Sequence, residues 1–189
     1  QVRETADPAL ANGGILELGQ LATKQMPDVW TMGKHLGFDV RVRPVMRLRK
    51  PMANPRPGKK AYGAGSEVDA FVVEAQKNHP DHRPRLENGS LLASGMQLAR
   101  RDRPAVYKDW LAARLGAIAQ VDREKTELVA FERSRVSRGH TSIEGPDATF
   151  HGELTVKDPE KFQTLLARGV GRHCAFGYGM LLLRPPRRR

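Results

Sequence analysis

Cationic side chains are concentrated in one short stretch of the sequence, and the chemistry that they could perform is phosphate binding. Positions 41–60 contain no aspartate or glutamate, and they hold Arg41, Arg43, Arg47, Arg49, Lys50, Arg56, Lys59 and Lys60. A guanidinium group can bind phosphate oxygens through two parallel hydrogen bonds, and each neutralised phosphate releases condensed counterions. The run therefore favours contact with nucleic acid, and the alternative is a charged sheet face that is only solvated.

A second group of arginines occupies the stretch FERSRVSRG, which begins at Phe131. Side chains alternate between the two faces of a strand, so Arg133 and Arg135 would lie on the same face as Phe131. The two arginines could contact an RNA backbone while the ring stacks on a base. Arg138 follows where we expect a loop that carries His140, Thr141 and Ser142. The alternative is the tip of a charged hairpin.

A glycine-rich stretch, RGVGRHCAFGYG at 168–179, surrounds Arg172 and His173. Its glycines could bring backbone amides close to a phosphate, and they are Gly169, Gly171, Gly177 and Gly179. The stretch lacks P-loop spacing. It also follows an expected helix and precedes an expected strand, the reverse of a dinucleotide-binding turn. It is a candidate RNA contact, and the alternative is a helix C-cap followed by a tight turn.

No other group of side chains has the spacing of a metal centre or of a nucleophilic site. The chain has one cysteine, Cys174, and the pair His79 and His82 has no further ligand nearby. Glu67 and Asp69 are better explained as a solvated or arginine-paired acidic patch. The sequence therefore predicts no metal and no cofactor.

The overall charge agrees with a polyanionic partner. The 189 residues carry a net charge of +11, for which nucleic acid is the first candidate and a membrane surface the second. No segment approaches the roughly 20 apolar residues of a membrane-spanning helix, so we expect no membrane partner. A single cysteine fits a reducing compartment, and we expect a cytoplasmic protein.

These candidate residues need a scaffold, and the hydrophobic patterns predict one. Strands are expected at 37–50, 126–136, 148–156 and 176–183, and helices at 104–116 and 159–168. Most of 51–103 reads as a long loop, with a short strand or helical turn possible near 65–77. The strand at 37–50 contains Pro44, so it should lie at an edge or carry a bulge. The order β-α-β-β-α-β predicts an α+β, ferredoxin-like fold, whose open sheet face binds RNA in RRM-type modules.

Several of these segments together resemble the CasE-type CRISPR endoribonucleases. The resemblance rests on FDVRVRPVMRLRK, EVDAF, YKDWLAARLG, FHGELTVKDPEKFQTLLARG and the glycine-rich GVGRHCAFGYGMLLLRPP, in that order. It implies a tandem pair of ferredoxin-like domains. Residues 1–33, with one short strand expected at 15–18, would be a remnant of the N-terminal domain and a linker. Residues 34–189 would be the C-terminal RNA-binding domain, with an insertion at about 51–103.

The resemblance also implies an activity. Members of the family cut CRISPR repeat hairpin RNA without metal, through attack by a ribose 2′-OH, and retain the crRNA beside other subunits of the Cascade surveillance complex. Their catalytic histidine lies on the first helix of the N-terminal domain, whereas residues 1–33 contain no histidine. We therefore assign no catalytic residue. A non-catalytic RNA-binding subunit and a basic structural protein of a ribonucleoprotein remain as alternatives.

Overall fold

The structure is a computed structural model that describes residues 27, 29–54, 60–78, 86–87, 90–91 and 101–187. The chain divides into two units, Gln1–Trp30 and Thr31–Arg189, and the fold described below belongs to the second unit. The short strand expected at 15–18 lies outside the described residues.

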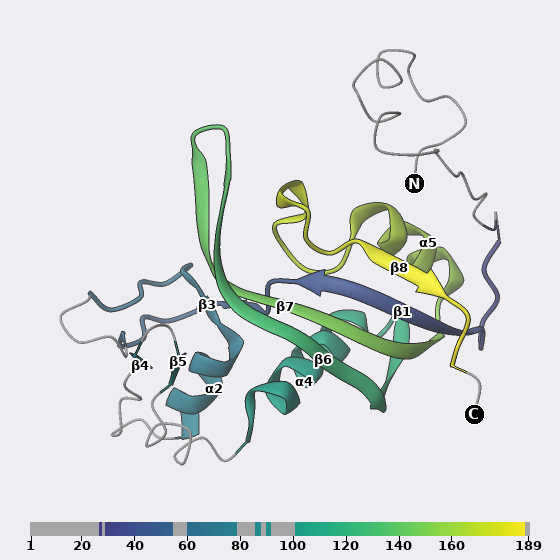
Figure 1. Cartoon of the computed structure of the whole chain (residues 1–189), viewed down its shortest axis with the longest axis horizontal. Coiled ribbons are helices and arrows are strands. Elements are labelled where there is room, and N and C mark those ends of the chain that lie inside the picture. Colours follow the sequence, from purple (N-terminus) through teal and green to yellow (C-terminus); the bar gives the residue numbers. More distant parts are fainter. Residues whose placement is uncertain are drawn as a thin grey trace. The chain divides into compact units, whose positions relative to one another are not determined.

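The second unit is built on a four-stranded antiparallel sheet with the strand order β6-β7-β1-β8. Along the chain, its strands and helices follow the order β-α-β-β-α-β, which confirms the predicted ferredoxin-like arrangement (Figure 1). The elements of this frame are β1 (His35–Val42), α4 (Arg103–Leu115), β6 (Ala119–Arg138), β7 (Thr141–Val156), α5 (Pro159–Arg168) and β8 (Leu181–Arg184).

The hydrophobic core covers one face of this sheet. Phe38 of β1 and Phe150 of β7 are fully buried, together with Leu111 of α4 and Phe162 of α5. On β1 and β7, the residues that alternate with these are mostly polar, as expected for a sheet with one face packed and one face open. Arg41, the candidate residue within β1, therefore lies on the open face.

Both helices begin as the sequence predicts. Asp102 accepts a hydrogen bond from the Ala105 amide at 2.8 Å and caps α4. In the same way, Asp158 accepts one from the Lys161 amide at 3.0 Å and caps α5. A proline follows each cap within the first turn, where its missing N–H is not needed. Gly169 ends α5 with a φ of 84°, a conformation that favours glycine.

The predicted strand at 37–50 is wrong as a single element. The chain leaves the sheet after β1 and resumes as β2 (Val45–Arg47), which pairs with β3 (Glu67–Asp69) in a separate two-stranded sheet. The break falls at Arg43 and Pro44. β1 is a central strand between β7 and β8, and proline lacks the N–H that such a strand must donate.

The segment expected as a long loop contains regular structure. It holds β3, α2 (Ala70–Asn78), β4 (Leu86–Glu87) and β5 (Ser90–Leu91). Val68, Val72 and Val73 form a small core of their own, with Met46 and Tyr62 packed against it. The short strand or helical turn expected near 65–77 is confirmed, and both a strand and a helix are present there.

The two strands predicted at 126–136 and 148–156 are the middle parts of a longer hairpin. β6 and β7 stay paired as far as Arg138 opposite Thr141, and register shifts interrupt the pairing at Asp122/Glu127 and Leu128/Ala130. Figure 1 shows this hairpin extending beyond the rest of the sheet. The loop that was expected to carry His140, Thr141 and Ser142 is instead a short turn, with Gly139 at a φ of 56°.

The last predicted strand is shorter and more exposed than expected. Residues 174–176 form a single 3-10 turn, η2 (Cys174–Phe176), and β8 begins only at Leu181. Leu182 is 56% exposed, so the strand is not buried on both faces. Within the described residues, β8 pairs with β1 alone and forms an edge of the sheet. In the same part of the chain, no helix combines the length and apolar character needed to cross a membrane.

Candidate nucleic-acid interface

The cations of β2 and of the residues just after it are exposed. Arg47, Arg49 and Lys50 all lie at the surface, and Arg47 donates one long hydrogen bond, of 3.3 Å, to the Gly65 carbonyl. None of the three is ion-paired with a carboxylate in the part of the chain that the structure describes. They form a segment of uncompensated positive charge, called here the β2 basic segment. Arg56 and Lys59, which belong to the same acid-free run, lie outside the described residues.

Arg41 has a different environment, because it binds a buried carboxylate. Its Nε and Nη2 donate to the two oxygens of Asp147 at 2.9 Å and 2.6 Å. The hydroxyls of Ser134 and Tyr178 donate to the same carboxylate, each at 2.8 Å. Burial alone would raise the pKa of Asp147, but hydrogen bonds from Arg41, Ser134 and Tyr178 outweigh it and hold that pKa below its usual value. Arg41 remains 53% exposed on its outer side.

Arg43 is buried, which corrects the expectation of four arginines on one exposed face. It is only 2% exposed, and its Nη2 donates to the carbonyl and the hydroxyl of Ser134 at 2.7 Å and 3.0 Å. Its guanidinium lies 5.0 Å from the centre of the Tyr178 ring, and its Nε has no hydrogen-bond partner. The alternation that predicted an exposed Arg43 ends with β1, because the backbone turns at Pro44.

The hairpin arginines are also partly compensated. Arg135 is 71% exposed and donates to Glu144 on the opposite strand at 3.1 Å. Arg133 is 22% exposed and lies 3.8 Å from Glu144 and 3.9 Å from Asp69. Arg138 is the last residue of β6, and its side chain is outside the described part. Arg133 and Arg135 thus share one carboxylate near the middle of the extended hairpin.

Phe131 does not stack beside these arginines but packs on another one. The guanidinium of Arg103 lies 4.2 Å from the centre of the Phe131 ring and 4.5 Å from that of Phe71. Arg103 also donates to Asp69 at 3.1 Å and to the Tyr107 hydroxyl at 2.7 Å. This cluster joins β3 and α2 to α4 and to the base of the hairpin.

The glycines of the predicted RNA loop bring parts of the protein backbone together. The amide of Gly169 donates to Leu165, that of Gly177 to Cys174 and that of Gly179 to Arg41, at 2.7, 3.0 and 2.7 Å. A Cβ at Gly179 would lie 2.5 Å from the Val170 carbonyl oxygen, and one at Gly171 would lie 3.0 Å from the Trp110 ring. The amides of Gly169, Gly177 and Gly179 are thus used within the protein, and the glycines fix the shape of the loop.

Arg172 and His173 of this loop meet at a single carboxylate. Arg172 Nε contacts Glu67 Oε1, and His173 Nε2 lies 2.5 Å from Glu67 Oε2. His173 has a φ of 65°, the one positive value among non-glycine residues in the described part. Glu67 lies opposite Arg47 in the β2-β3 pairing. The fold therefore brings the glycine-rich loop next to the β2 basic segment, although the two are more than a hundred residues apart in sequence.

Comparison with known proteins supplies the family. The sequence profile of the family described as "CRISPR associated protein" matches residues 5–185. The chain belongs to this family. No curated protein sequence matches it. Its fold is similar to a solved CRISPR endoribonuclease Cse3 bound to a 19-nucleotide RNA, with 21% identity, a TM-score of 0.55, and coverage of 87% of this chain and 62% of that one.

A Thermus thermophilus Cse3 bound to an RNA that represents a pre-cleavage complex is also similar to this CRISPR-associated protein. The identity is 21% and the TM-score 0.50, and the match covers 86% of this chain and 59% of that one. The chain therefore spans about three fifths of the length of these structures. At this identity the likeness shows a shared fold.

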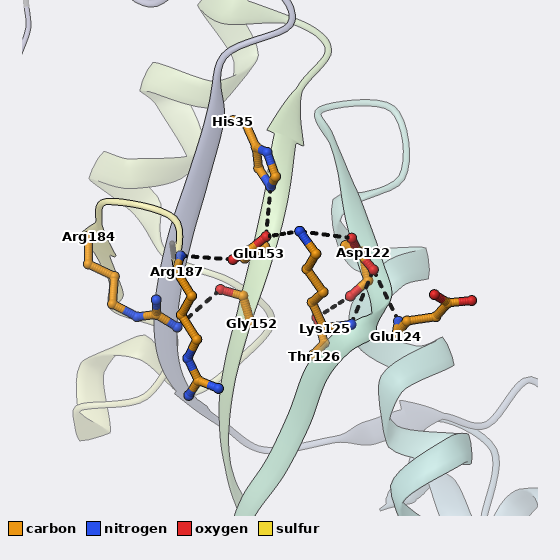
Figure 2. A network of polar contacts seen from close by, with 9 residues as sticks. All are labelled: His35, Asp122, Glu124, Lys125, Thr126, Gly152, Glu153, Arg184 and Arg187. Atoms are coloured by element: carbon orange, nitrogen blue, oxygen red, sulfur yellow. Dashed lines mark hydrogen bonds and ion pairs between the residues drawn. The ribbon is translucent and has the colours of Figure 1, made fainter. Parts of the chain in front are cut away.

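A polar network at the start of β1 was not foreseen from the sequence of this CRISPR-associated protein. Figure 2 shows His35, Lys125 and the Arg187 amide converging on the buried carboxylate of Glu153, at 3.0, 2.6 and 2.9 Å. The hydrogen bond from Lys125 is the main reason that the pKa of Glu153 is lowered. The network joins β1, β6 and β7 to the residues after β8. Alternation along β7 places Glu153 on the open face, so no sequence pattern predicted its burial.

Proposed function

We propose that this CRISPR-associated protein binds CRISPR repeat hairpin RNA. The observation that carries the proposal is the β2 basic segment: Arg47, Arg49 and Lys50 are exposed without a described carboxylate partner, and the fold places them beside Arg172. Unpaired guanidinium and ammonium groups on one surface are the electrostatic footprint of a nucleic-acid binder. Family membership and the shared fold with RNA-bound Cse3 support RNA as the ligand.

In this proposal the predicted residues have two kinds of role. Direct phosphate contact is assigned to Arg47, Arg49, Lys50, Arg135, Arg138, Arg172 and His173, of which Arg47, Arg49, Lys50, Arg135 and Arg172 are exposed and His173 is 18% exposed. The other predicted residues hold these cations in place. The polar groups of Arg41, Arg43 and Arg133 are already engaged within the protein. The glycines shape the loop through their backbone hydrogen bonds or close packing, and they are Gly169, Gly171, Gly177 and Gly179.

The bound RNA would then be cut at one phosphodiester without metal. A general base removes the proton from a ribose 2′-OH, whose oxygen attacks the adjacent phosphorus. A general acid protonates the departing 5′-oxygen, while cations stabilise the charge that develops on the phosphate. The products are a 2′,3′-cyclic phosphate and a 5′-hydroxyl. The protein would retain the crRNA and join other subunits of a Cascade complex.

The cleavage step is tested by incubating the protein with repeat hairpin RNA in EDTA. We expect one cut, with a 2′,3′-cyclic phosphate on the 5′ fragment and a 5′-hydroxyl on the other. A requirement for divalent metal, or a 3′-hydroxyl end, would contradict this mechanism. An unrelated hairpin of the same length is the control, and equal affinity for both RNAs at moderate salt would indicate a basic structural protein instead.

A second candidate function is a non-catalytic RNA-binding subunit of a ribonucleoprotein. It needs only the binding surface that the described residues supply, because no side chain of the described residues has been assigned to the cleavage step. Tight binding of the repeat hairpin without cleavage over a long incubation would select it.

A further inference from the structure

The open face of the sheet contains a small pocket at the irregular part of the β6-β7 pairing. The pocket has a volume of about 280 Å³ and is lined by Arg41, Ala130, Phe131, Glu132, Asp147 and Thr149. It lies beside the register shift between Leu128 and Ala130, and such bulges occur preferentially next to functional sites. Its volume is just below the range of about 300–1,000 Å³ usual for ligand pockets, which suits a flat group the size of one nucleobase.

Arg41 is held in this pocket in a fixed orientation. The bidentate contact with Asp147 uses its Nε and Nη2, and its guanidinium carbon lies 5.2 Å from the centre of the buried Tyr178 ring. The Arg41 side chain is nevertheless 53% exposed. A planar cation with one side toward an aromatic ring and the other toward solvent is a surface on which a base can stack.

Polar groups without partners line the same pocket. In the described part of the chain, Arg41 Nη1 and the Thr149 hydroxyl have no hydrogen-bond partner, and the 68% exposed Glu132 approaches only Arg41 Nη2, at 4.0 Å. The pocket therefore offers an N–H donor, a hydroxyl and an exposed carboxylate whose ion pair with Arg41 is long. A phosphate would be repelled by Glu132 and Asp147, whereas an uncharged ligand with its own N–H donors would satisfy Glu132.

We propose that this pocket binds one unpaired guanine of the RNA. Guanine is the base that presents two adjacent N–H donors, at N1 and at the 2-amino group, which a carboxylate such as Glu132 can accept together. Its O6 accepts from the Thr149 hydroxyl, and its ring stacks on the guanidinium of Arg41. This site rests on the proposed RNA-binding function, and it adds recognition of a base to contacts that are otherwise made with phosphates.

The test uses a series of repeat hairpin RNAs with a single-stranded flank of adenosines. One guanosine is placed at successive flank positions, and each RNA is compared with a version that carries inosine, which lacks the 2-amino group. Fluorescence anisotropy measures the affinity of the wild-type protein, Glu132→Gln and the control Glu127→Gln. Glu127 is exposed on the same strand and does not line the pocket. Thermal unfolding of each variant checks that the fold is retained.

At one flank position we expect the wild-type protein to bind guanosine about tenfold more tightly than inosine. Glu132→Gln should lose most of this preference, and Glu127→Gln should keep it. Hairpin binding without any guanosine preference in the wild-type protein would overturn the pocket assignment and leave the proposed function standing. That result is also expected if the pocket holds a cationic side chain of another protein. Absence of hairpin binding altogether would overturn the proposed function and this inference together.

Discussion

The arginines on the two sides of Pro44 have opposite environments. Before it, Arg41 and Arg43 are tied to Asp147 and Ser134 and lie over the Tyr178 ring. After it, Arg47 and Arg49 are exposed and have no described carboxylate partner. The same residue type, repeated at the same spacing, thus stabilises the fold on one side of the proline and is free to bind a ligand on the other.

The difference shows that the number of arginines in a stretch of sequence does not give the number of guanidinium groups that can bind a ligand at the surface. A guanidinium whose donors are already used by a carboxylate or a carbonyl offers less to a phosphate, because binding must first break those hydrogen bonds. Arg43 should therefore affect mainly the free energy of unfolding, and Arg41 should affect it through Asp147 in addition to making the proposed contact with a base. Arg47 and Arg49 should affect mainly RNA affinity, and substitutions on the two sides of Pro44 can test this separation.

The largest effect is expected for Asp147→Asn. Asp147 is buried and accepts hydrogen bonds from Arg41, Ser134 and Tyr178. Asparagine would replace one acceptor oxygen by an NH2 group, which cannot accept these hydrogen bonds. We expect the free energy of unfolding to fall by about 3 kcal/mol, measured by urea denaturation. Asp39→Asn is the control. Its longer contacts, 3.3 Å to Arg184 and 3.7 Å to His151, predict a loss below about 1 kcal/mol. Equal losses would contradict the structural role of the Asp147 network.

The next effect concerns the other side of Pro44. The double variant Arg47→Glu with Arg49→Glu reverses two exposed charges, and we expect repeat hairpin RNA to bind at least about tenfold more weakly at low salt. The free energy of unfolding should change little, because the only contact of these side chains in the described residues is the 3.3 Å hydrogen bond from Arg47 to Gly65. Arg123→Glu on β6, whose guanidinium lies 3.0 Å from Asp109, is the control. If this control weakens binding as much, the effect reflects net charge rather than the β2 basic segment.

A smaller effect is expected for Glu67→Gln. Glu67 neutralises the cationic residues of the glycine-rich loop through its contacts with Arg172 and His173. Removing its charge leaves Arg172 uncompensated, so RNA affinity at low salt should rise about threefold. Glu74→Gln, on α2 at 3.9 Å from Arg101, serves as the matched control. Weaker binding by Glu67→Gln would mean that the ion pair is needed to shape the loop for RNA.

The smallest expected effect is a difference in the pH dependence of stability between a variant of the Asp147 network and a variant of the β2 basic segment. The pKa of Asp147 is lowered in the folded protein, so its stabilising contribution is complete above its usual value of 3.8 and disappears as the pH falls through the folded value. The difference in unfolding free energy between the wild-type protein and Asp147→Asn should therefore stay constant well above pH 3.8 and shrink as the pH falls below that value. For Arg49→Ala, which changes no carboxylate contact, the corresponding difference should stay constant. A constant difference for Asp147→Asn would contradict the assigned network.

The ferredoxin-like frame could be predicted because local signals agree with it. Asp102 and Asp158, each followed by a proline, mark the helix starts, and alternation marks the main strands. The division of 37–50 into β1 and β2 could not be predicted, because the new partner of β2 is β3, about twenty residues further along the chain. The full length of the β6-β7 hairpin was also missed, because an exposed two-stranded ribbon needs no apolar alternation.

The residue types of the candidate site could be predicted from the sequence, but which of its cations are exposed and unpaired could not. Exposed Arg47, Arg49 and Lys50 follow directly from the acid-free run. Arg43 is buried against Ser134, which is 91 positions away, and Arg172 forms an ion pair with Glu67, which is more than a hundred positions away. No local sequence pattern encodes such distant contacts. The glycines were predicted as points where backbone amides approach RNA, whereas Gly169, Gly171 and Gly179 instead approach other parts of the protein. Their contacts are with Val170, Cys174 and Trp110 of the same chain.

The central claim is that the β2 basic segment contacts RNA phosphates. It is tested by measuring the affinity for repeat hairpin RNA over a range of salt concentrations, for the wild-type protein and for a variant with Arg47, Arg49 and Lys50 all changed to alanine. The slope of log affinity against log salt should become shallower by about 2 to 3 in the variant, because each phosphate contact contributes roughly 0.7 to 0.9. An unchanged slope, with the variant still folded, would contradict the account.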